Sequence, residues 1–93
     1  MPLSFEWDDA KARTNVTKHG VSFEEASTVF GDPHSLTMDD PAHSQTEQRW
    51  VVLGMSTRQR LLVVVFTERG DNIRVISART ASKRERSNYE EIP

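Results

Sequence analysis

Residues 60–79 read RLLVVVFTERGDNIRVISAR, which has the pattern of two consecutive strands. A near-continuous apolar run over Arg60–Thr67 is typical of a strand that is buried on both faces. The turn-forming residues Arg69-Gly70-Asp71-Asn72 follow, and Ile73–Arg79 predicts the last strand of the chain. Because the connection is short, the two strands are expected to pair as an antiparallel hairpin.

Two further strands are expected upstream of this hairpin. Gln48–Met55 contains the apolar run Trp50-Val51-Val52-Leu53, and Ser35–Met38 has the composition of an edge strand. Leu3–Trp7 is consistent either with a short strand or with an anchored arm. The sequence thus predicts an antiparallel sheet of three to four strands.

Capping residues predict three helices. Asp8 is a suitable N-cap and Gly20 a suitable C-terminal stop for a helix over 9–19. Ser22–Glu25 and Ser82–Glu85 each have the S-x-x-E form of a capping box, which opens helices over 22–30 and from 82 to about 91. Together with the strands, they predict a single α+β domain over 1–93, with two N-terminal helices packed on the sheet and one C-terminal helix.

Composition restricts the class of protein. The chain has no cysteine, which excludes disulfides, thiol nucleophiles and cysteine zinc sites. No signal-peptide pattern or membrane-length apolar run is present, so we expect a soluble cytoplasmic protein with no membrane partner. Residues 1–55 carry a net charge of −5 and residues 56–93 a net charge of +3, which permits a local anion site on an acidic protein.

Short motifs along most of the chain resemble one protein family, the BrnT-type toxins of bacterial type II toxin–antitoxin systems, which share the fold of RelE-like ribonucleases. The order and spacing of the motifs carry the resemblance. They are F-E-W-D-x-x-K from Phe5, N-x-x-K-H-G-V-S-F from Asn15, V-F-x-D-P from Val29, D-P-x-H-S-x-x-E-x-R from Asp40, R-L-L-V-V from Arg60 and I-S-A-R-x-A-x-x-x-E-R-x-x-Y-E from Ile76. Gln59 departs from the family pattern, which usually has glycine in this turn.

The resemblance implies an endoribonuclease that inhibits translation, needs no metal or cofactor, and acts on RNA that is free or presented by the ribosome. It also implies a cognate antitoxin with a ribbon-helix-helix DNA-binding part, through which alone operator DNA would be bound. A second hypothesis stays open, because the net charge is negative and no orthodox acid–base pair is present. In that hypothesis the protein is a non-catalytic binding module that completes the antitoxin's repressor complex.

Most candidates for RNA chemistry are basic residues, joined by Glu85 and Tyr89. Arg79 ends the last strand before a capped helix, and arginine is the natural clamp for phosphate; the alternative is a structural ion pair with Glu85. The catalytic candidates are Arg79, His19, Lys11 and Glu85, and the candidates for substrate binding are Lys18, Arg58, Arg60, Arg86 and Tyr89.

Each candidate has a structural alternative. His19 stands before Gly20, where a histidine can also cap helix carbonyls. Lys11, Asn15 and Lys18 share a helix face that is either solvated or turned toward a ligand, and Tyr89 is either a stacking platform for a base or a packed side chain. Asp39, Asp40 and His43 match no standard metal spacing, so no metal site is predicted.

Overall fold

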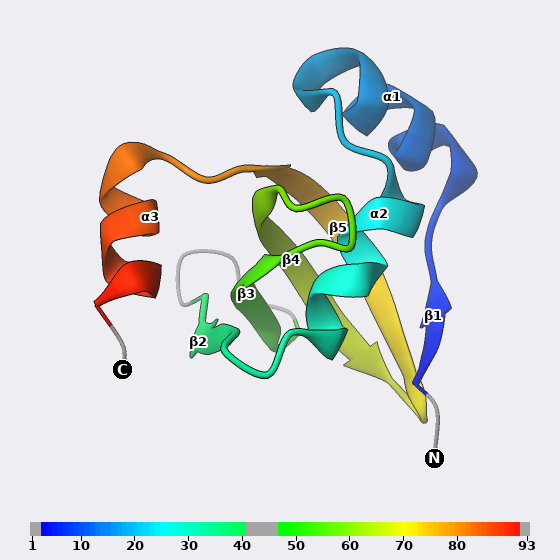
Figure 1. The fold of residues 1–93 in the computed structure, drawn as a ribbon. Helices are drawn as coiled ribbons and strands as arrows, with labels where there is room; N and C mark the ends of the chain where they lie inside the picture. Colours follow the sequence, from blue (N-terminus) through cyan, green and yellow to red (C-terminus); the bar gives the residue numbers. More distant parts are fainter. Residues whose placement is uncertain (1–2, 41–46, 92–93) are drawn as a thin grey trace.

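One mixed sheet of five strands forms the centre of the computed structural model, which describes residues 3–40 and 47–91 (Figure 1). The strand order across the sheet is β1-β5-β4-β3-β2. The strands are β1 (Ser4–Glu6), β2 (Leu36–Asp39), β3 (Arg49–Met55), β4 (Leu61–Arg69) and β5 (Asn72–Thr80). The hairpin predicted from residues 60–79 is the antiparallel pair β4 and β5.

The predicted α+β class is confirmed, but the prediction of an antiparallel sheet with three to four strands was wrong. The additional strand β1 runs parallel to β5, with Ser4 opposite Asn72 and Glu6 opposite Arg74. Long-range contacts hold it there: Glu6 accepts a hydrogen bond from Arg74 Nη1 at 2.9 Å, and the Phe5 ring packs at a tilt against Phe30, with ring centroids 5.3 Å apart. A three-residue segment carries no pattern from which such a pairing can be predicted.

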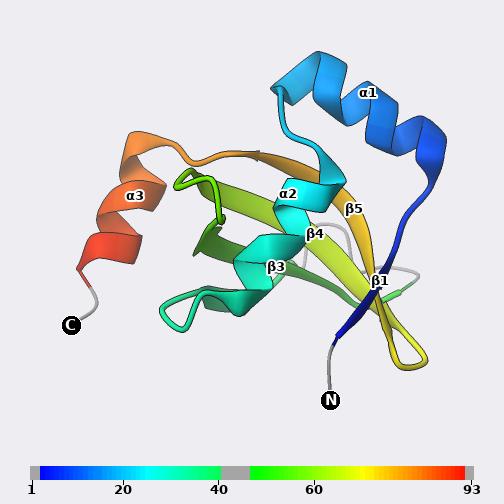
Figure 2. The same cartoon turned by 45° about the vertical axis from the view of Figure 1, so that its right-hand side comes forward.

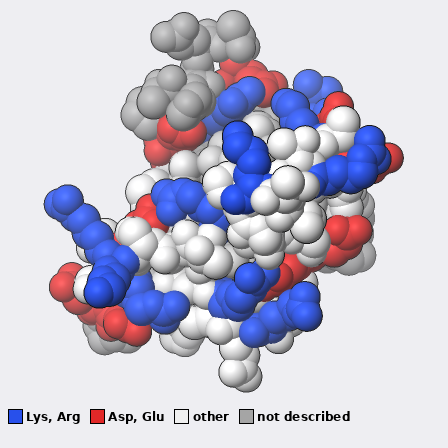
Figure 3. Space-filling view, turned by 90° about the horizontal axis from the view of Figure 1, so that it is seen from above, with Lys and Arg blue, Asp and Glu red and all other residues white. Residues whose placement is uncertain are grey.

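The described residues form helices α1 (Asp9–His19), α2 (Phe23–Ser27) and α3 (Lys83–Glu90), and a 3₁₀ turn η1 (Thr28–Gly31) continues α2 (Figures 1 and 2). The predicted caps of α1 are confirmed: Asp8 accepts from the Lys11 amide at 3.0 Å, and Gly20 takes the left-handed conformation with φ 69°. The capping box that opens α3 is complete. Seen from the end where α1 lies, many Lys and Arg side chains are exposed (Figure 3).

The second predicted capping box is only half formed. Ser22 Oγ accepts from the Glu25 amide at 3.0 Å, as expected. The Glu25 carboxylate, however, does not return to the backbone of Ser22; it accepts from Ser56 Oγ at 2.8 Å and from Arg60 Nε at 2.9 Å. The Glu25 carboxylate therefore binds a cation and a hydroxyl more than thirty residues away in the sequence instead of the local amide.

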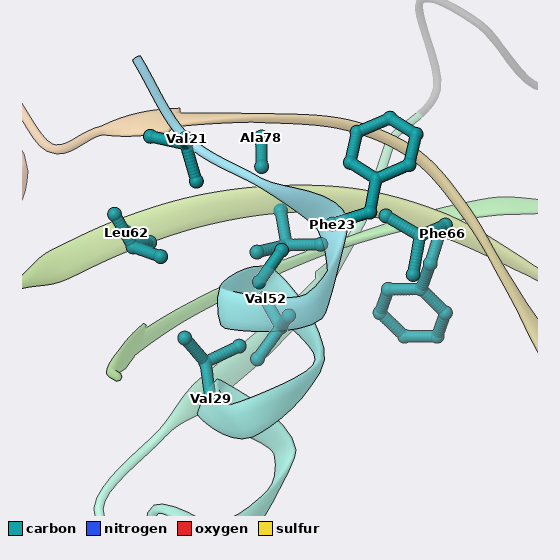
Figure 4. Close-up of a cluster of buried hydrophobic side chains, with 10 residues drawn as sticks. Val21, Phe23, Val29, Val52, Leu62, Phe66 and Ala78 are labelled. Atoms are coloured by element: carbon teal, nitrogen blue, oxygen red, sulfur yellow. The ribbon is translucent and has the colours of Figure 1, made fainter. Parts of the chain in front are cut away.

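The main core lies between one face of the sheet and the segment that contains α2 and η1. Figure 4 shows Val21, Phe23 and Val29 from this segment facing Val52 and Leu62 of the sheet. These side chains are almost fully buried, and each contributes about 1.5–3 kcal/mol through burial. By contrast, α1 lies at the margin of the sheet against β5, and Asn15 is its only buried residue in the described chain.

The opposite face of the sheet is covered only in part. Leu53, Leu61 and Val63 are buried there, and Tyr89 of α3 packs against them. Farther along the same face Val65 and Ser77 remain half-buried. The sheet thus has one covered face and one partly open face.

The β3–β4 turn contains a strained residue. Gln59 has φ 62°, the only positive φ of a non-glycine residue in the described ranges. This is the position at which the motif resemblance implies glycine. A left-handed residue with a side chain is unfavourable, so the turn keeps the shape that glycine would adopt at some cost in stability.

Candidate active site

A β-bulge in β5 decides which side chains reach the open face of the sheet. Val65 of β4 lies opposite Ser77, but the next residue, Phe66, lies opposite Val75, so Ile76 is an extra residue in β5. Strict alternation from the buried Val75 would turn residues 77 and 79 toward the core. The extra residue reverses the alternation, because a bulge re-aims the side chains that follow it.

Burial agrees with this reversal. Ala78, three positions after Val75, is also in the core, at 1% exposure. Ser77 is half-buried and Arg79 is exposed, and both line a hollow on the open face. The bulge is therefore the local feature that brings Arg79, the leading catalytic candidate, to the surface.

The first hollow has a volume of about 360 Å³ and collects three of the four predicted catalytic residues. His19, Arg79 and Glu85 line it together with Asp40, Ser77 and apolar side chains of β3, β4 and β5. His19 comes from the end of α1, Arg79 from the end of β5 and Glu85 from the first turn of α3. The tertiary structure thus brings His19 next to two residues that lie 60 or more positions farther along the sequence.

The second hollow adjoins the first and has a volume of about 280 Å³. It lies between α1 and β5 and contains Lys11 and Lys18, the fourth catalytic candidate and a predicted substrate-binding residue. His19 and Ser77 line both hollows. The two hollows therefore lie side by side and share a boundary.

Arg79 forms a bidentate ion pair with Glu85. Arg79 Nη1 and Nη2 donate to the two carboxylate oxygens, each at 2.8 Å, and Nη1 also donates to the carbonyl of Thr80 at 3.3 Å. Within residues 3–40 and 47–91, Nε–H and the second N–H of Nη2 have no partner. Arg79 therefore keeps donors for an anion while Glu85 fixes its orientation.

The same contacts set the charge of Glu85. Hydrogen bonds from Arg79, and then from the Ser82 amide, lower the pKa of Glu85 to about 2 despite the opposing effect of burial. Glu85 in turn raises the pKa of Arg79. At neutral pH the pair is a carboxylate and a guanidinium, so Glu85 is suited to position Arg79 and poorly suited to donate a proton.

Asn15 joins α1 to β5 and was not predicted as an important residue. Its Nδ2 donates to the carbonyls of Val21 and Ala78, both at 2.8 Å, and its Oδ1 accepts from the Ala78 amide at 3.1 Å. We expected its helix face to be solvated or turned toward a ligand, but Asn15 itself is 5% exposed and binds backbone. A polar residue in the motif N-x-x-K-H-G was the available signal, and the sequence could not show which backbone groups it meets.

Arg60 is held in a structural ion pair. It donates from Nε and Nη2 to the Glu25 carboxylate, and from Nη2 to the carbonyl of Gly20 at 3.1 Å. The hydrogen bonds from Arg60 hold the pKa of the buried Glu25 carboxyl below its usual value. Arg60 thus secures the turn after His19, and Arg58 is exposed on the neighbouring turn; neither lines the two hollows in the described part of the chain.

Two predicted substrate-binding residues on α3 also lie outside both hollows. The hydroxyl of Tyr89 donates to Asp32 Oδ2 at 2.6 Å, which raises the pKa of Tyr89 to about 12. Arg86 is half exposed, and its Nη1 lies 3.9 Å from Glu90 Oε2. Of the two alternatives for Tyr89, the structure shows the packed side chain, which holds α3 against the rest of the domain.

The described residues contain neither a cluster of metal ligands nor a membrane-spanning helix. Residues 3–40 and 47–91 contain no group of three or more His, Cys, Asp or Glu side chains placed to hold a metal ion. His43, part of the weak Asp39–Asp40–His43 set, lies outside the described residues. No described helix is long and apolar enough to span a membrane.

Comparisons with known proteins agree with the motif resemblance. The family model of the ribonuclease toxin BrnT of type II toxin–antitoxin systems matches residues 7–85. The chain is also similar to the crystal structure of the Brucella abortus ribonuclease toxin BrnT, with 25% sequence identity and a TM-score of 0.64. That match covers 88% of this chain and all of the Brucella chain. A comparison with curated proteins gave no match.

Proposed function

The chain belongs to the BrnT family of ribonuclease toxins of type II toxin–antitoxin systems, and we propose that it is a metal-independent endoribonuclease that inhibits translation. The observation that carries the proposal is the position of Arg79. It stands on the open face of the sheet beside His19, with two N–H groups that no described residue binds. We also propose that the fold is RelE-like, as the motif resemblance implies.

The proposed reaction uses the RNA's own 2′-hydroxyl as the nucleophile. A base removes the proton, the 2′-oxygen attacks phosphorus, and the bond to the 5′-oxygen breaks as an acid protonates it. The products are a 2′,3′-cyclic phosphate and a 5′-hydroxyl end. This step is balanced without water, metal or cofactor.

The residues around the hollows suit the separate tasks of this reaction. Arg79 stabilises the charge that develops on the phosphate oxygens, because its N–H groups are fixed by Glu85 before the substrate arrives. His19 can accept or donate a proton through its imidazole. Lys11 and Lys18 hold the neighbouring backbone by charge, while Glu85 positions Arg79.

The family suggests the partners. A type II toxin pairs with a cognate antitoxin, and we propose one with a ribbon-helix-helix part that binds operator DNA on behalf of the complex. We further propose that the protein acts in the cytoplasm on RNA that is free or presented by the ribosome. Mass spectrometry of the complex purified with the product of the neighbouring gene tests the first part of this proposal.

A second candidate function is the non-catalytic binding module. The specific observation that favours it is the closed bidentate pair between Arg79 and Glu85, which a purely structural ion pair would also form. In this case the protein forms the antitoxin complex and cleaves no RNA.

A cleavage assay separates the two candidates. Purified, antitoxin-free protein is incubated with total RNA in EDTA, beside Arg79→Ala and the control Arg69→Ala. Arg69 is an exposed arginine at the opposite end of the β4–β5 hairpin. We expect cleavage by wild type and by Arg69→Ala, and a loss of about 100-fold or more for Arg79→Ala.

Other outcomes would redirect the proposal. Equal cleavage by a folded Arg79→Ala protein would remove Arg79 from the mechanism. Cleavage that EDTA abolishes would contradict the metal-independent step. No cleavage by wild type, repeated in a translating extract to include ribosome-presented RNA, would favour the binding module.

A further inference from the structure

Ser77 lies where the two hollows meet. It lines both of them, together with His19. Its side chain is half-buried on the open face, and its hydroxyl forms no hydrogen bond with any side chain or backbone group in residues 3–40 and 47–91. A hydroxyl that is open to water and has no protein partner can exchange its water for a ligand atom.

Cations lie on both sides of this hydroxyl. Lys11 and Lys18 are in the hollow beside α1, and Arg79 is in the hollow toward α3. Two carboxylates also line the hollow toward α3: Glu85, which is compensated by the ion pair with Arg79, and Asp40. A negatively charged chain that crosses the boundary at Ser77 would therefore meet a positive charge in each hollow.

The lining of the hollows indicates which part of RNA they contact. Apart from the imidazole of His19, no aromatic ring lines either hollow in the described chain. Bases bind to single-strand binding proteins largely by stacking on aromatic rings, whereas phosphates and sugars are bound by Lys, Arg and hydroxyl groups. Apart from the carboxylates of Asp40 and Glu85, the charged and hydroxyl groups that line the hollows are of the second kind.

We propose that the two hollows form one groove for two consecutive phosphates of an RNA strand, and that the Ser77 hydroxyl donates a hydrogen bond to the backbone where the hollows meet. The proposal rests on the function proposed above and deepens it. Ser77 contacts the substrate, and the bulge at Ile76 places Ser77 and Arg79 on the same face so that both reach one strand. The groove itself supplies affinity with little discrimination between bases.

The test measures binding separately from cleavage. The probe is a single-stranded 2′-fluoro oligonucleotide, which lacks the attacking 2′-hydroxyl and is not cut by the proposed reaction. Its affinity is measured by fluorescence anisotropy for wild type, Ser77→Ala and Ser77→Thr. The control is Ser4→Ala, which changes an exposed serine at the far end of the strand pair β1 and β5.

We expect Ser77→Ala to weaken binding by about five- to tenfold, the effect of one lost hydrogen bond to a charged acceptor at a solvent-accessible site. Ser77→Thr keeps the hydroxyl, so it should bind within about twofold of wild type, as should Ser4→Ala. Unchanged thermal unfolding of Ser77→Ala would assign the loss to the contact. Unchanged binding by Ser77→Ala would overturn the role of Ser77.

A second pair of probes tests the two-phosphate groove. Lys18→Gln should weaken the binding of the longer oligonucleotide. It should also reduce the slope of log affinity against log salt concentration by ~0.7, the value for one phosphate contact to a single strand. A dinucleotide with one phosphate, followed by NMR titration, should bind Lys18→Gln and wild type alike, because Arg79 takes its phosphate. Equal effects on both probes would overturn the groove. If wild type binds and cleaves RNA and these variants behave as wild type, the groove proposal is contradicted and the proposed function stands. If wild type binds no probe and cleaves no RNA, both proposals are contradicted.

Discussion

Replacing Asn15 by alanine tests the connection between the basic helix and the sheet. The side chain makes three hydrogen bonds, two as donor to the carbonyls of Val21 and Ala78 and one as acceptor from the Ala78 amide. Val21 and Ala78 are 0% and 1% exposed. Asn15→Ala would therefore remove the partner of backbone groups in the core rather than of groups on the surface.

The size of the effect follows from these contacts. A buried hydrogen bond contributes about 0.5–1.5 kcal/mol net, so three bonds give about 1.5–4.5 kcal/mol. Asn15 also lines the hollow beside α1, from which water can enter and satisfy part of the lost bonding. We therefore expect a loss of about 2–3 kcal/mol in the free energy of unfolding, or about 10–20 °C in Tm for a domain of this size.

The measurement is urea unfolding followed by the fluorescence of Trp7 and Trp50, with Thr17→Ala as the matched control on α1. Thr17 is exposed and bonds only within its own helix, so its replacement should change the free energy of unfolding by less than about 0.5 kcal/mol. A loss below about 1 kcal/mol for Asn15→Ala, at an unchanged m-value, would contradict the role of Asn15 as the main link between α1 and β5. It would mean that α1 is held to β5 mainly by other contacts.

Three further changes test other parts of the structure. Gln59→Gly should raise the free energy of unfolding by about 0.5–1 kcal/mol, since φ 62° suits glycine; no gain over Gln59→Ala in urea unfolding would contradict the strain. Tyr89→Phe should cost about 1–2 kcal/mol through the lost bond to Asp32. Because the pKa of Tyr89 is raised from 10.0 to about 12, wild type should lose this contribution between those pH values, and a parallel loss in Tyr89→Phe would speak against it. Glu85 has its pKa lowered from 4.5 to about 2, so its contribution is present above pH 4.5 and is lost as the pH falls toward 2. With the Arg79 side chain 45% exposed, the pair is worth less than about 1 kcal/mol, and urea unfolding of Glu85→Gln should show a correspondingly flatter acid profile.

The candidate site could be predicted in part because some of its residues are marked by local sequence. Arg79 at the end of an apolar strand and Glu85 in a capping box were identifiable, and the structure places both at one hollow with His19. The grouping of Lys11 with Ser77 was not identifiable, because it depends on how α1 meets β5. Arg60, like Arg79, is an arginine at the end of an apolar strand, yet it forms a structural ion pair with Glu25.

By itself the sequence determined the features that depend on neighbours along the chain. The helix starts at Asp8, Ser22 and Ser82 follow from side chains that bond amides three residues ahead, and the β4–β5 hairpin follows from its turn residues and apolar runs. These interactions close over a few residues. They form in much the same way whatever the rest of the chain does.

Only the tertiary structure decided the features in which distant groups compete for one partner. Glu25 leaves its capping box for Arg60, β1 pairs in parallel with β5, and the bulge at Ile76 reverses the alternation of β5. A buried carboxylate must be paired with a cation or a hydrogen-bond donor, and the backbone groups of a strand edge must be hydrogen-bonded. Which group meets that need depends on the segments that folding brings close together. The bulge at Ile76 turns Ser77 and Arg79 outward. It depends on contacts between segments that are distant in the sequence, and not on the order of residues within a single segment.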